Sequence, residues 1–229
     1  MTRRYLLLLM LAITGAAPFV SRAAEWTEGR NYFRVNAPRA TGQPAGVVEV
    51  MEVFSYACPA CNEFLPIAGK LKASLPANAR MVYLPAAFNR AEVWPMFQRA
   101  FLTAEVLGIA EQTHDAVFGA VWKTSELGVA DPATGRLKRV MPTIEDAARW
   151  YNGRTGVPVA KFLATAQSFS VDARIREADA LIREYQVYRT PTIVVNGKYR
   201  LDGQSAGGYP QLIELVKYLV AREAAAPKP

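Results

Sequence analysis

The stretch around residues 47–61 constrains the fold most, because a strand pattern runs directly into a helix pattern there. Residues 47–54 read VVEVMEVF, and a short apolar run of this kind predicts a buried strand. Proline is favoured at the first helical position, so Pro59 predicts a helix start. Apolar residues then recur at helical spacing, at Phe64, Leu65, Ala68, Leu71 and Leu75. A strand, a short turn and a helix are the beginning of an α/β unit.

Later segments extend this unit into a mixed sheet. Residues 80–84, RMVYL, predict a second strand, and the intervening helix requires that it runs parallel to the first. Near the C-terminus, Asn196-Gly197 is a strong two-residue hairpin turn between two apolar runs. Residues 94–165 show helical spacing without a period-two run. The sequence therefore predicts an α/β fold with a mixed central sheet, helices on both faces and an inserted all-helical subdomain.

Helix start positions within this plan are predicted from polar residues that precede apolar runs. Thr143-Ile144-Glu145-Asp146 resembles a capping box that opens a helix. Ser170 predicts the cap of a longer helix that continues to about Gln186.

The N-terminus predicts export. A basic start, an apolar run over residues 5–13 and small residues at Ser21 and Ala23 are typical of a secretory signal peptide at residues 1–23. The run is far shorter than the roughly 20 residues of a spanning helix, although an uncleaved anchor is the alternative. Cleavage after Ala23 lowers the formal charge from +7 to +4 by removing three arginines. No basic run with interleaved aromatics remains, which argues against nucleic acid as a partner.

The chain has two cysteines, Cys58 and Cys61. Disulfides persist in exported proteins, but a structural disulfide stabilises mainly by closing a long loop. A bridge across two intervening residues closes only a very short loop and adds little stability. The pair therefore indicates a chemical role rather than a structural one. At a helix N-terminus, unpaired N–H groups and the macrodipole favour a thiolate, so we expect a lowered pKa at Cys58. Cys61, one turn on, would resolve the mixed disulfide.

Metal and haem sites fit these cysteines less well. A structural zinc site needs four ligands, and His114 is the only histidine of the chain. Covalent haem attachment needs histidine directly after the second cysteine, where Asn62 stands. We therefore predict no metal site, while copper(I) on the two thiolates remains an open alternative.

Three stretches, EVFSYACPACNEF, YRTPTIVVNGKYRL and EGRNYF, together with the helical insert, resemble the DsbA-like thiol oxidoreductases of the thioredoxin superfamily. The resemblance covers nearly all of residues 24–229. It implies a thioredoxin fold in two parts, residues 24–88 and 166–229, separated by a helical insert at 89–165.

The resemblance also implies roles for individual residues. It identifies Cys58 and Cys61 as the catalytic dithiol, and Pro191 as a cis-proline that packs beside the sulfurs. Thr190 and Pro191 would hold the substrate backbone. Pro59 and Ala60, between the cysteines, would set the redox poise and line the substrate site.

Glu52 is the third candidate catalytic residue. Glu49 and Glu52 are an odd number of positions apart, so they point to opposite faces of the strand and at least one is expected to point inward. The family keeps a buried acid at the place of Glu52, six residues before Cys58. Such a carboxyl has a raised pKa and could shuttle a proton to Cys61. The alternative is a glutamate at the strand end that reaches solvent. Many relatives place a lysine nearby, but RMVYLP offers none.

Two departures from the family pattern concern the redox potential. The strongest oxidants carry Pro-His between the cysteines, where this chain has Pro59-Ala60. Alanine can donate neither charge nor a hydrogen bond to the Cys58 thiolate, so we expect a weaker oxidant. Thr190 replaces the valine of many strong oxidants, and its hydroxyl could bond a substrate or a thiolate.

The expected function is that of a periplasmic thiol:disulfide interchange enzyme. It would introduce disulfides into reduced or unfolded exported proteins through Cys58 and Cys61, without a bound cofactor. The resemblance implies reoxidation by a DsbB-like, quinone-linked membrane thiol oxidase. Residues 24–46 are too short for the dimerisation region of the isomerases, so a monomer is expected. The alternatives are a reductase or isomerase with the same site, and a non-catalytic copper or thiol carrier.

Overall fold

The computed structural model describes residues 26–90, 93–131 and 133–226, so the predicted signal peptide lies outside the described residues. A five-stranded sheet has the order β1-β5-β4-β2-β3. Its strands are β1 (Phe33–Arg34), β2 (Val48–Phe54), β3 (Ala79–Pro85), β4 (Thr192–Val195) and β5 (Tyr199–Leu201). The β2–β3 pair is parallel and the other pairs are antiparallel, which confirms the mixed sheet. The two-residue β1 was not predicted, since it is too short to show a period.

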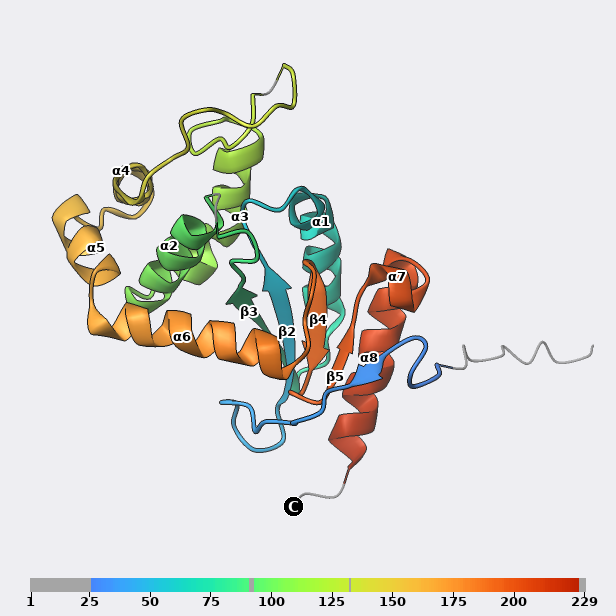
Figure 1. Cartoon of the computed structure of the whole chain (residues 1–229). Helices are drawn as coiled ribbons and strands as arrows, with labels where there is room; N and C mark the ends of the chain where they lie inside the picture. The colour runs from blue at the N-terminus through green and yellow to red at the C-terminus, as the bar shows by residue number, and fades with distance from the viewer. Residues whose placement is uncertain (1–25, 91–92, 132, 227–229) are drawn as a thin grey trace, which may run out of the picture.

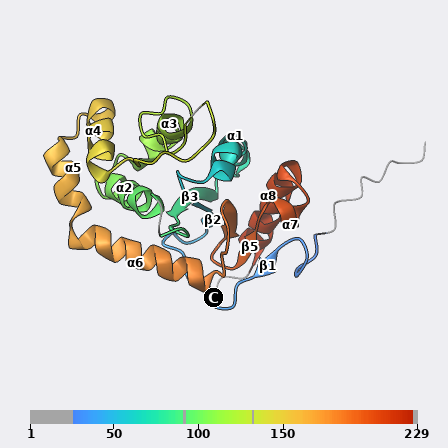
Figure 2. The same cartoon turned by 45° about the horizontal axis from the view of Figure 1, so that its top comes forward.

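Helices cover both faces of the sheet (Figures 1 and 2). The helices are α1 (Pro59–Ser74), α2 (Trp94–Val106), α3 (Ala110–Trp122), α4 (Ile144–Thr155), α5 (Val159–Ala166), α6 (Phe169–Glu184), α7 (Gly203–Ala206) and α8 (Tyr209–Ala225). Helices α1 and α8 pack on one face, where Val50 joins a core with Leu71 and Leu215. Helix α6 covers the other face. The described part of the chain contains no helix that is both long and apolar enough to cross a membrane.

Strand β2 lies at the centre of this arrangement, and all seven of its residues are buried. Val48 and Val50 belong to the core beneath α1 and α8, whereas Met51 and Val53 belong to the core beneath α6. Because both faces are covered, Glu49 and Glu52 are also buried. The alternative of a solvent-reaching Glu52 is therefore wrong.

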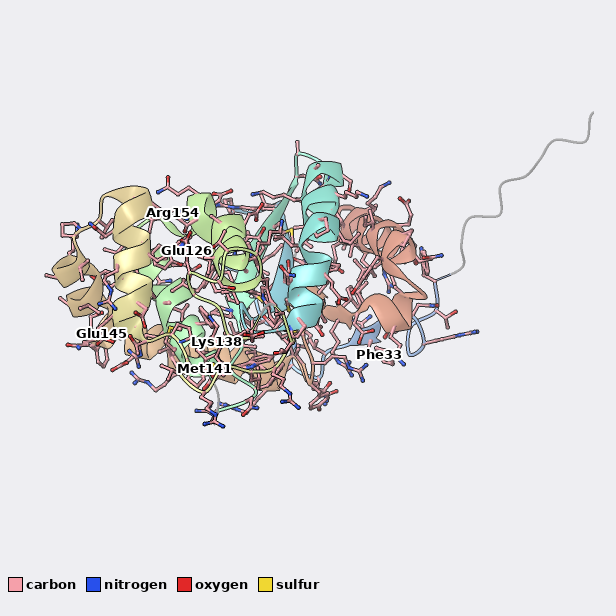
Figure 3. All side chains as sticks on the ribbon, turned by 90° about the horizontal axis from the view of Figure 1, so that it is seen from above. Phe33, Glu126, Lys138, Met141, Glu145 and Arg154 are labelled. Atoms are coloured by element: carbon pink, nitrogen blue, oxygen red, sulfur yellow. The ribbon has the colours of Figure 1, made fainter. Side chains whose placement is uncertain are left out.

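The helices between β3 and β4 pack around aromatic side chains such as Phe97, Phe101 and Phe118, in a core that also includes Phe54 of β2 and the two cysteines. Helix α2 packs against α4, α5 and α6, and also touches β3. Seen from above, Phe33 of β1 lies on one side of α1, and Glu126, Lys138 and Arg154 lie on the other (Figure 3).

Local signals placed one helix start and the hairpin turn correctly and misplaced another helix start. Thr143 caps α4 in a capping box with Asp146, as predicted. Asn196 and Gly197 have φ values of 52° and 61°, which fits the predicted tight hairpin. The cap predicted at Ser170 is wrong. Ser168 caps α6, because its Oγ accepts a hydrogen bond from the Val171 N–H, and the helix begins two residues earlier than Ser170 suggested.

Candidate active site

The two cysteines lie at the N-terminus of α1, directly after the turn that follows β2. Cys58 is the N-cap residue, and Pro59 occupies the first turn of the helix. The Cys61 N–H donates to the Cys58 carbonyl at 3.1 Å. Both cysteines are free thiols, with Cys58 6 % exposed and Cys61 fully buried. Cys58 is therefore the sulfur that a substrate reaches first.

The surroundings of the cysteines push their pKa values apart. A hydrogen bond from the Cys61 side chain lowers the pKa of Cys58 to about 6, with help from the Thr190 side chain and the Ala60 and Cys61 N–H groups. Burial is the main cause that raises the pKa of Cys61, and the Cys58 thiolate and Glu52 add to it. An outer thiolate beside an inner protonated thiol is the arrangement that dithiol exchange requires.

The cis-proline loop approaches Cys58 from the other half of the chain. The Thr190–Pro191 peptide bond is cis. The Cys58 Sγ donates a hydrogen bond to the Thr190 carbonyl at 3.6 Å, across 132 residues of sequence. Pairing of β4 with β2 produces this approach, because β4 begins one residue after Pro191. A cavity of about 230 Å³ borders Thr190, Pro191 and Tyr209.

Glu52 is a buried acid on the same β2 face as Val50 and Phe54, beneath the cysteines. It is 2 % exposed, and its Oε2 has no hydrogen-bond partner among the described residues. Burial, followed by the nearby charges of Asp115 and Cys58, raises its pKa to about 8. Glu52 can therefore hold or release a proton near neutral pH.

An aromatic cluster beside β2 contains three residues that sequence reasoning left unassigned, Tyr56, Tyr83 and His114. Tyr83 stands opposite Glu52 in the β2–β3 register. His114 of α3 stacks on Tyr83 with ring centroids 4.0 Å apart and is hydrogen-bonded to the Tyr56 hydroxyl at 3.1 Å. Burial lowers the pKa of His114 to about 3, so its ring is neutral at pH 7. No local pattern links His114 to the cysteines, because α3 belongs to the helical insert.

The loop before Cys58 is held by contacts to α3, the helix that also carries His114. Tyr56 is 1 % exposed and packs edge-on against Phe54 and Phe118. The indole N–H of Trp122 donates to the Tyr56 carbonyl at 2.8 Å. The helical insert therefore anchors the segment that carries the outer cysteine.

A dithiol at a helix N-terminus, with a cis-proline loop against its outer sulfur and a buried acid below, defines a thiol-disulfide oxidoreductase of the thioredoxin fold. Comparisons with known proteins agree with this class. A family model described as Thioredoxin matches residues 35–214. The thiol:disulfide interchange protein DsbA of Pseudomonas aeruginosa is 36 % identical over 226 residues, which cover 99 % of each chain. The DsbA of Azotobacter vinelandii is 32 % identical, with 86 % of this chain and 85 % of the relative covered.

Solved structures give the same result. A crystal structure of a variant of Pseudomonas aeruginosa DsbA superposes with a TM-score of 0.75 at 37 % identity, covering 88 % of this chain and all of the other. The DsbA of Xylella fastidiosa reaches 0.73 at 33 % identity, covering 86 % and 97 %. The chain belongs to the DsbA family of thiol:disulfide oxidoreductases.

Proposed function

We propose that this chain works as an exported oxidase that introduces disulfides into reduced or unfolded proteins of the periplasm. The observation that carries the proposal is the unequal pair of thiols. A lowered pKa at Cys58 stabilises the reduced protein relative to its disulfide, and a stabilised reduced form makes an oxidant. The relatives named DsbA support the same direction.

The proposed reaction transfers two electrons from a substrate dithiol to the Cys58–Cys61 disulfide. A substrate thiolate attacks the Cys58 Sγ, and the bond between the two protein sulfurs breaks. The leaving Cys61 needs a proton because its pKa is raised, and Glu52, with a pKa of about 8, supplies it. The second substrate thiolate then attacks the substrate sulfur of the mixed disulfide. Cys58 leaves as a thiolate, which its low pKa favours.

The cis-proline loop would position the substrate for this attack. The Thr190 carbonyl already lies 3.6 Å from the Cys58 Sγ, so a substrate chain that pairs with the Thr190 backbone places its cysteine beside Cys58. Pro59 and Ala60 border the same approach. A quinone-linked membrane thiol oxidase would return the dithiol to the disulfide. The reaction needs no bound cofactor, and we propose that the protein acts as a monomer.

The reduction potential against glutathione buffers tests the direction of this reaction. At pH 7, a pKa of about 6 stabilises the reduced form by about elevenfold through thiolate ionisation, against about twofold for thioredoxin and about 3000-fold for a strongly oxidising DsbA with a pKa near 3.5. A tenfold change in this stabilisation corresponds to roughly 30 mV. Calculated from the potential of thioredoxin, the expected value is about −250 mV, and calculated from that of the strong oxidant it is about −190 mV. The range lies above the roughly −270 mV of thioredoxin and below the roughly −120 mV of the strong oxidant.

A potential at or below that of thioredoxin would overturn the oxidase and favour a reductase. The matched functional assay follows the oxidative folding of a reduced substrate protein, with Cys58→Ser as the inactive control. Recovery of a scrambled substrate without net oxidation would indicate an isomerase. Stoichiometric copper(I) binding without turnover would instead indicate a carrier.

A further inference from the structure

A cavity of about 430 Å³ lies beside the cis-proline loop, and its lining carries an excess of positive charge. Three arginines, Arg30, Arg189 and Arg200, face one acid, Asp202. Arg189 is partly neutralised, because its Nε lies 3.8 Å from the Asp202 Oδ2 and its Nη1 donates to the Gln204 Oε1 at 2.6 Å. We call this cavity the arginine pocket.

Arg200 is held in this pocket without a hydrogen-bond acceptor among the described residues. Its guanidinium lies over the Phe33 ring at 4.8 Å and over the Tyr188 ring at 6.0 Å; Phe33 is labelled in Figure 3. The Arg200 Nε is buried and has no hydrogen-bond partner in the described part of the chain. Within the same residues, neither Arg30 nor Arg200 forms an ion pair. An ordered, unpaired guanidinium offers a planar set of donors that fits a carboxylate.

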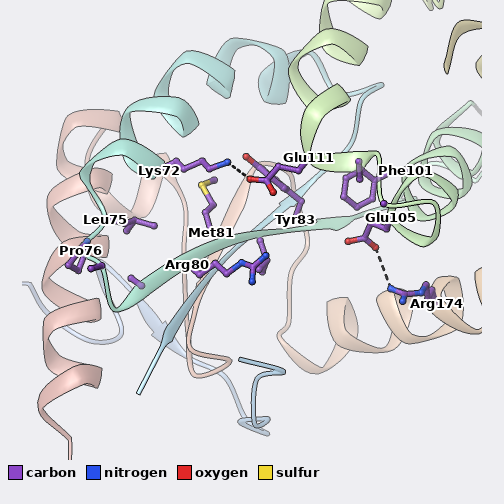
Figure 4. A pocket seen from close by; sticks show the side chains of 15 residues that line it. Lys72, Leu75, Pro76, Arg80, Met81, Tyr83, Phe101, Glu105, Glu111 and Arg174 are labelled. Atoms are coloured by element: carbon purple, nitrogen blue, oxygen red, sulfur yellow. Dashed lines mark hydrogen bonds and ion pairs between the residues drawn. The ribbon is translucent and has the colours of Figure 1, made fainter. Parts of the chain in front are cut away.

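A larger cavity elsewhere has most of its charged side chains paired. It measures about 650 Å³ and lies along β3, with none of the cysteine motif or the cis-proline loop in its lining. Four of its five charged side chains form ion pairs, Lys72 with Glu111 at 2.9 Å and Arg174 with Glu105 at 3.7 Å (Figure 4). Arg80 is the fifth, and it forms no ion pair with the described residues. The larger cavity therefore has an excess of one positive charge, whereas the arginine pocket has an excess of two and places both Arg30 and Arg200 there without an ion pair to the described residues.

The arginine pocket is continuous with the proposed substrate site. It shares Arg189, Asp202 and Gln204 with the cavity that borders Pro191. Arg200 stands opposite Val194 in the β4–β5 register, three residues beyond Pro191. At about 3.3 Å per residue, this separation is roughly 10 Å along β4. A substrate chain that is also extended would span the same distance with about three residues.

We propose that the arginine pocket receives an acidic side chain of the substrate polypeptide, about three residues away from the substrate cysteine. The inference rests on the proposed function, because it assigns a substrate preference to the same site. The carboxylate would bind Arg200 and Arg30, and the Phe33 and Tyr188 rings would flank the methylene groups of a glutamate. Substrates with an acid at this spacing would react faster than neutral ones.

The test uses single-cysteine peptides that carry one glutamate at each position from four before to four after the cysteine. Matched peptides carry glutamine instead. The rate constant for mixed-disulfide formation with the oxidised protein is measured for each pair by stopped flow. We expect a glutamate-to-glutamine ratio of about ten at one position near three residues from the cysteine, and a ratio near one elsewhere. The preference should weaken as ionic strength rises.

Arg200→Gln and Arg30→Gln provide two independent variants, and exposed Arg30 can be changed without disturbing the sheet. Each should lower the ratio to about three or less. Arg176→Gln is the matched control, because Arg176 also lies over a ring, Phe169 at 5.6 Å, but on α6 and outside the pocket. This variant should keep the full ratio.

The outcomes separate the two proposals. If glutamine peptides react but no position favours glutamate, the acidic subsite is refuted and the oxidase stands. A preference that survives unchanged in both Arg200→Gln and Arg30→Gln also refutes the subsite. If no peptide reacts with the oxidised protein, the proposed function fails and the inference fails with it.

Discussion

Replacing Glu52 with glutamine should stabilise the folded protein at neutral pH, although it removes a proposed catalytic group. The side chain is 2 % exposed and its pKa is raised from 4.5 to about 8, mainly by burial. Between pH 4.5 and pH 8, the Glu52 carboxyl therefore keeps its proton in the folded protein, whereas it has released the proton in the unfolded chain. The wild-type protein therefore loses stability as pH rises from about 4.5 to about 8.

The magnitude follows from the pH interval. Between 4.5 and pH 7, roughly 2.5 pH units at about 1.36 kcal/mol each come to about 3 kcal/mol. This value is an upper bound, because the glutamine amide is also buried and its polar atoms cost about 1 kcal/mol or more if unpaired. We expect a net gain of about 1 to 3 kcal/mol in the free energy of unfolding at pH 7.

Urea unfolding of wild type and Glu52→Gln at several pH values measures this gain. The difference should be close to zero or unfavourable at pH 4 and should grow up to about pH 8. It should also be larger in the reduced protein, because the Cys58 thiolate is one of the charges that raise the Glu52 pKa. Glu49→Gln is the control on the same strand, where a hydrogen bond from the Gln43 Nε2 at 3.1 Å compensates part of the burial.

A pH-independent difference between Glu52→Gln and wild type would refute this reasoning. So would a variant that is less stable than wild type at pH 8. A Glu49→Gln effect as large as that of Glu52→Gln would show that burial alone, rather than the missing hydrogen-bond partner and nearby charges, determines the cost.

Three further predictions concern the thiols and the hairpin. Thr190→Val should raise the pKa of Cys58 from about 6, because it removes the hydrogen bond from the Thr190 side chain. A titration of the ultraviolet absorbance of the thiolate measures this pKa, and an unchanged value would contradict the role of the hydroxyl. Ala60→His should raise the reduction potential by tens of mV, roughly 30 mV for each tenfold stabilisation of the reduced form, and a lower potential in glutathione buffers would count against it. Asn196→Ala should lower stability to urea by about 1 to 3 kcal/mol, because it forces alanine to a φ of 52° and removes a 2.6 Å hydrogen bond to Glu223. Asn196→Gly should lose less, and equal losses would show that backbone conformation does not contribute.

The amino-acid sequence by itself determined the local units of this protein. A strand followed by Pro59 placed the cysteines at a helix start, Asn196-Gly197 placed the hairpin, and Thr143 placed a helix N-terminus. These features depend on residues within a few positions of each other, so propensity and spacing are sufficient to predict them. The family resemblance then supplied the arrangement of these units, which spacing alone left open.

Only the tertiary structure decided which distant residues surround the cysteines. It brought Thr190 to Cys58 across 132 residues, and it placed His114 of the helical insert against Tyr83. It also gathered the arginine pocket from an N-terminal loop, the cis-proline loop and β5. Such contacts depend on how strands pair and helices pack over long chain separations, and no residue's immediate neighbours encode them. The same packing buries Glu52 and separates the two thiol pKa values, because desolvation and nearby charge exist only in the folded chain.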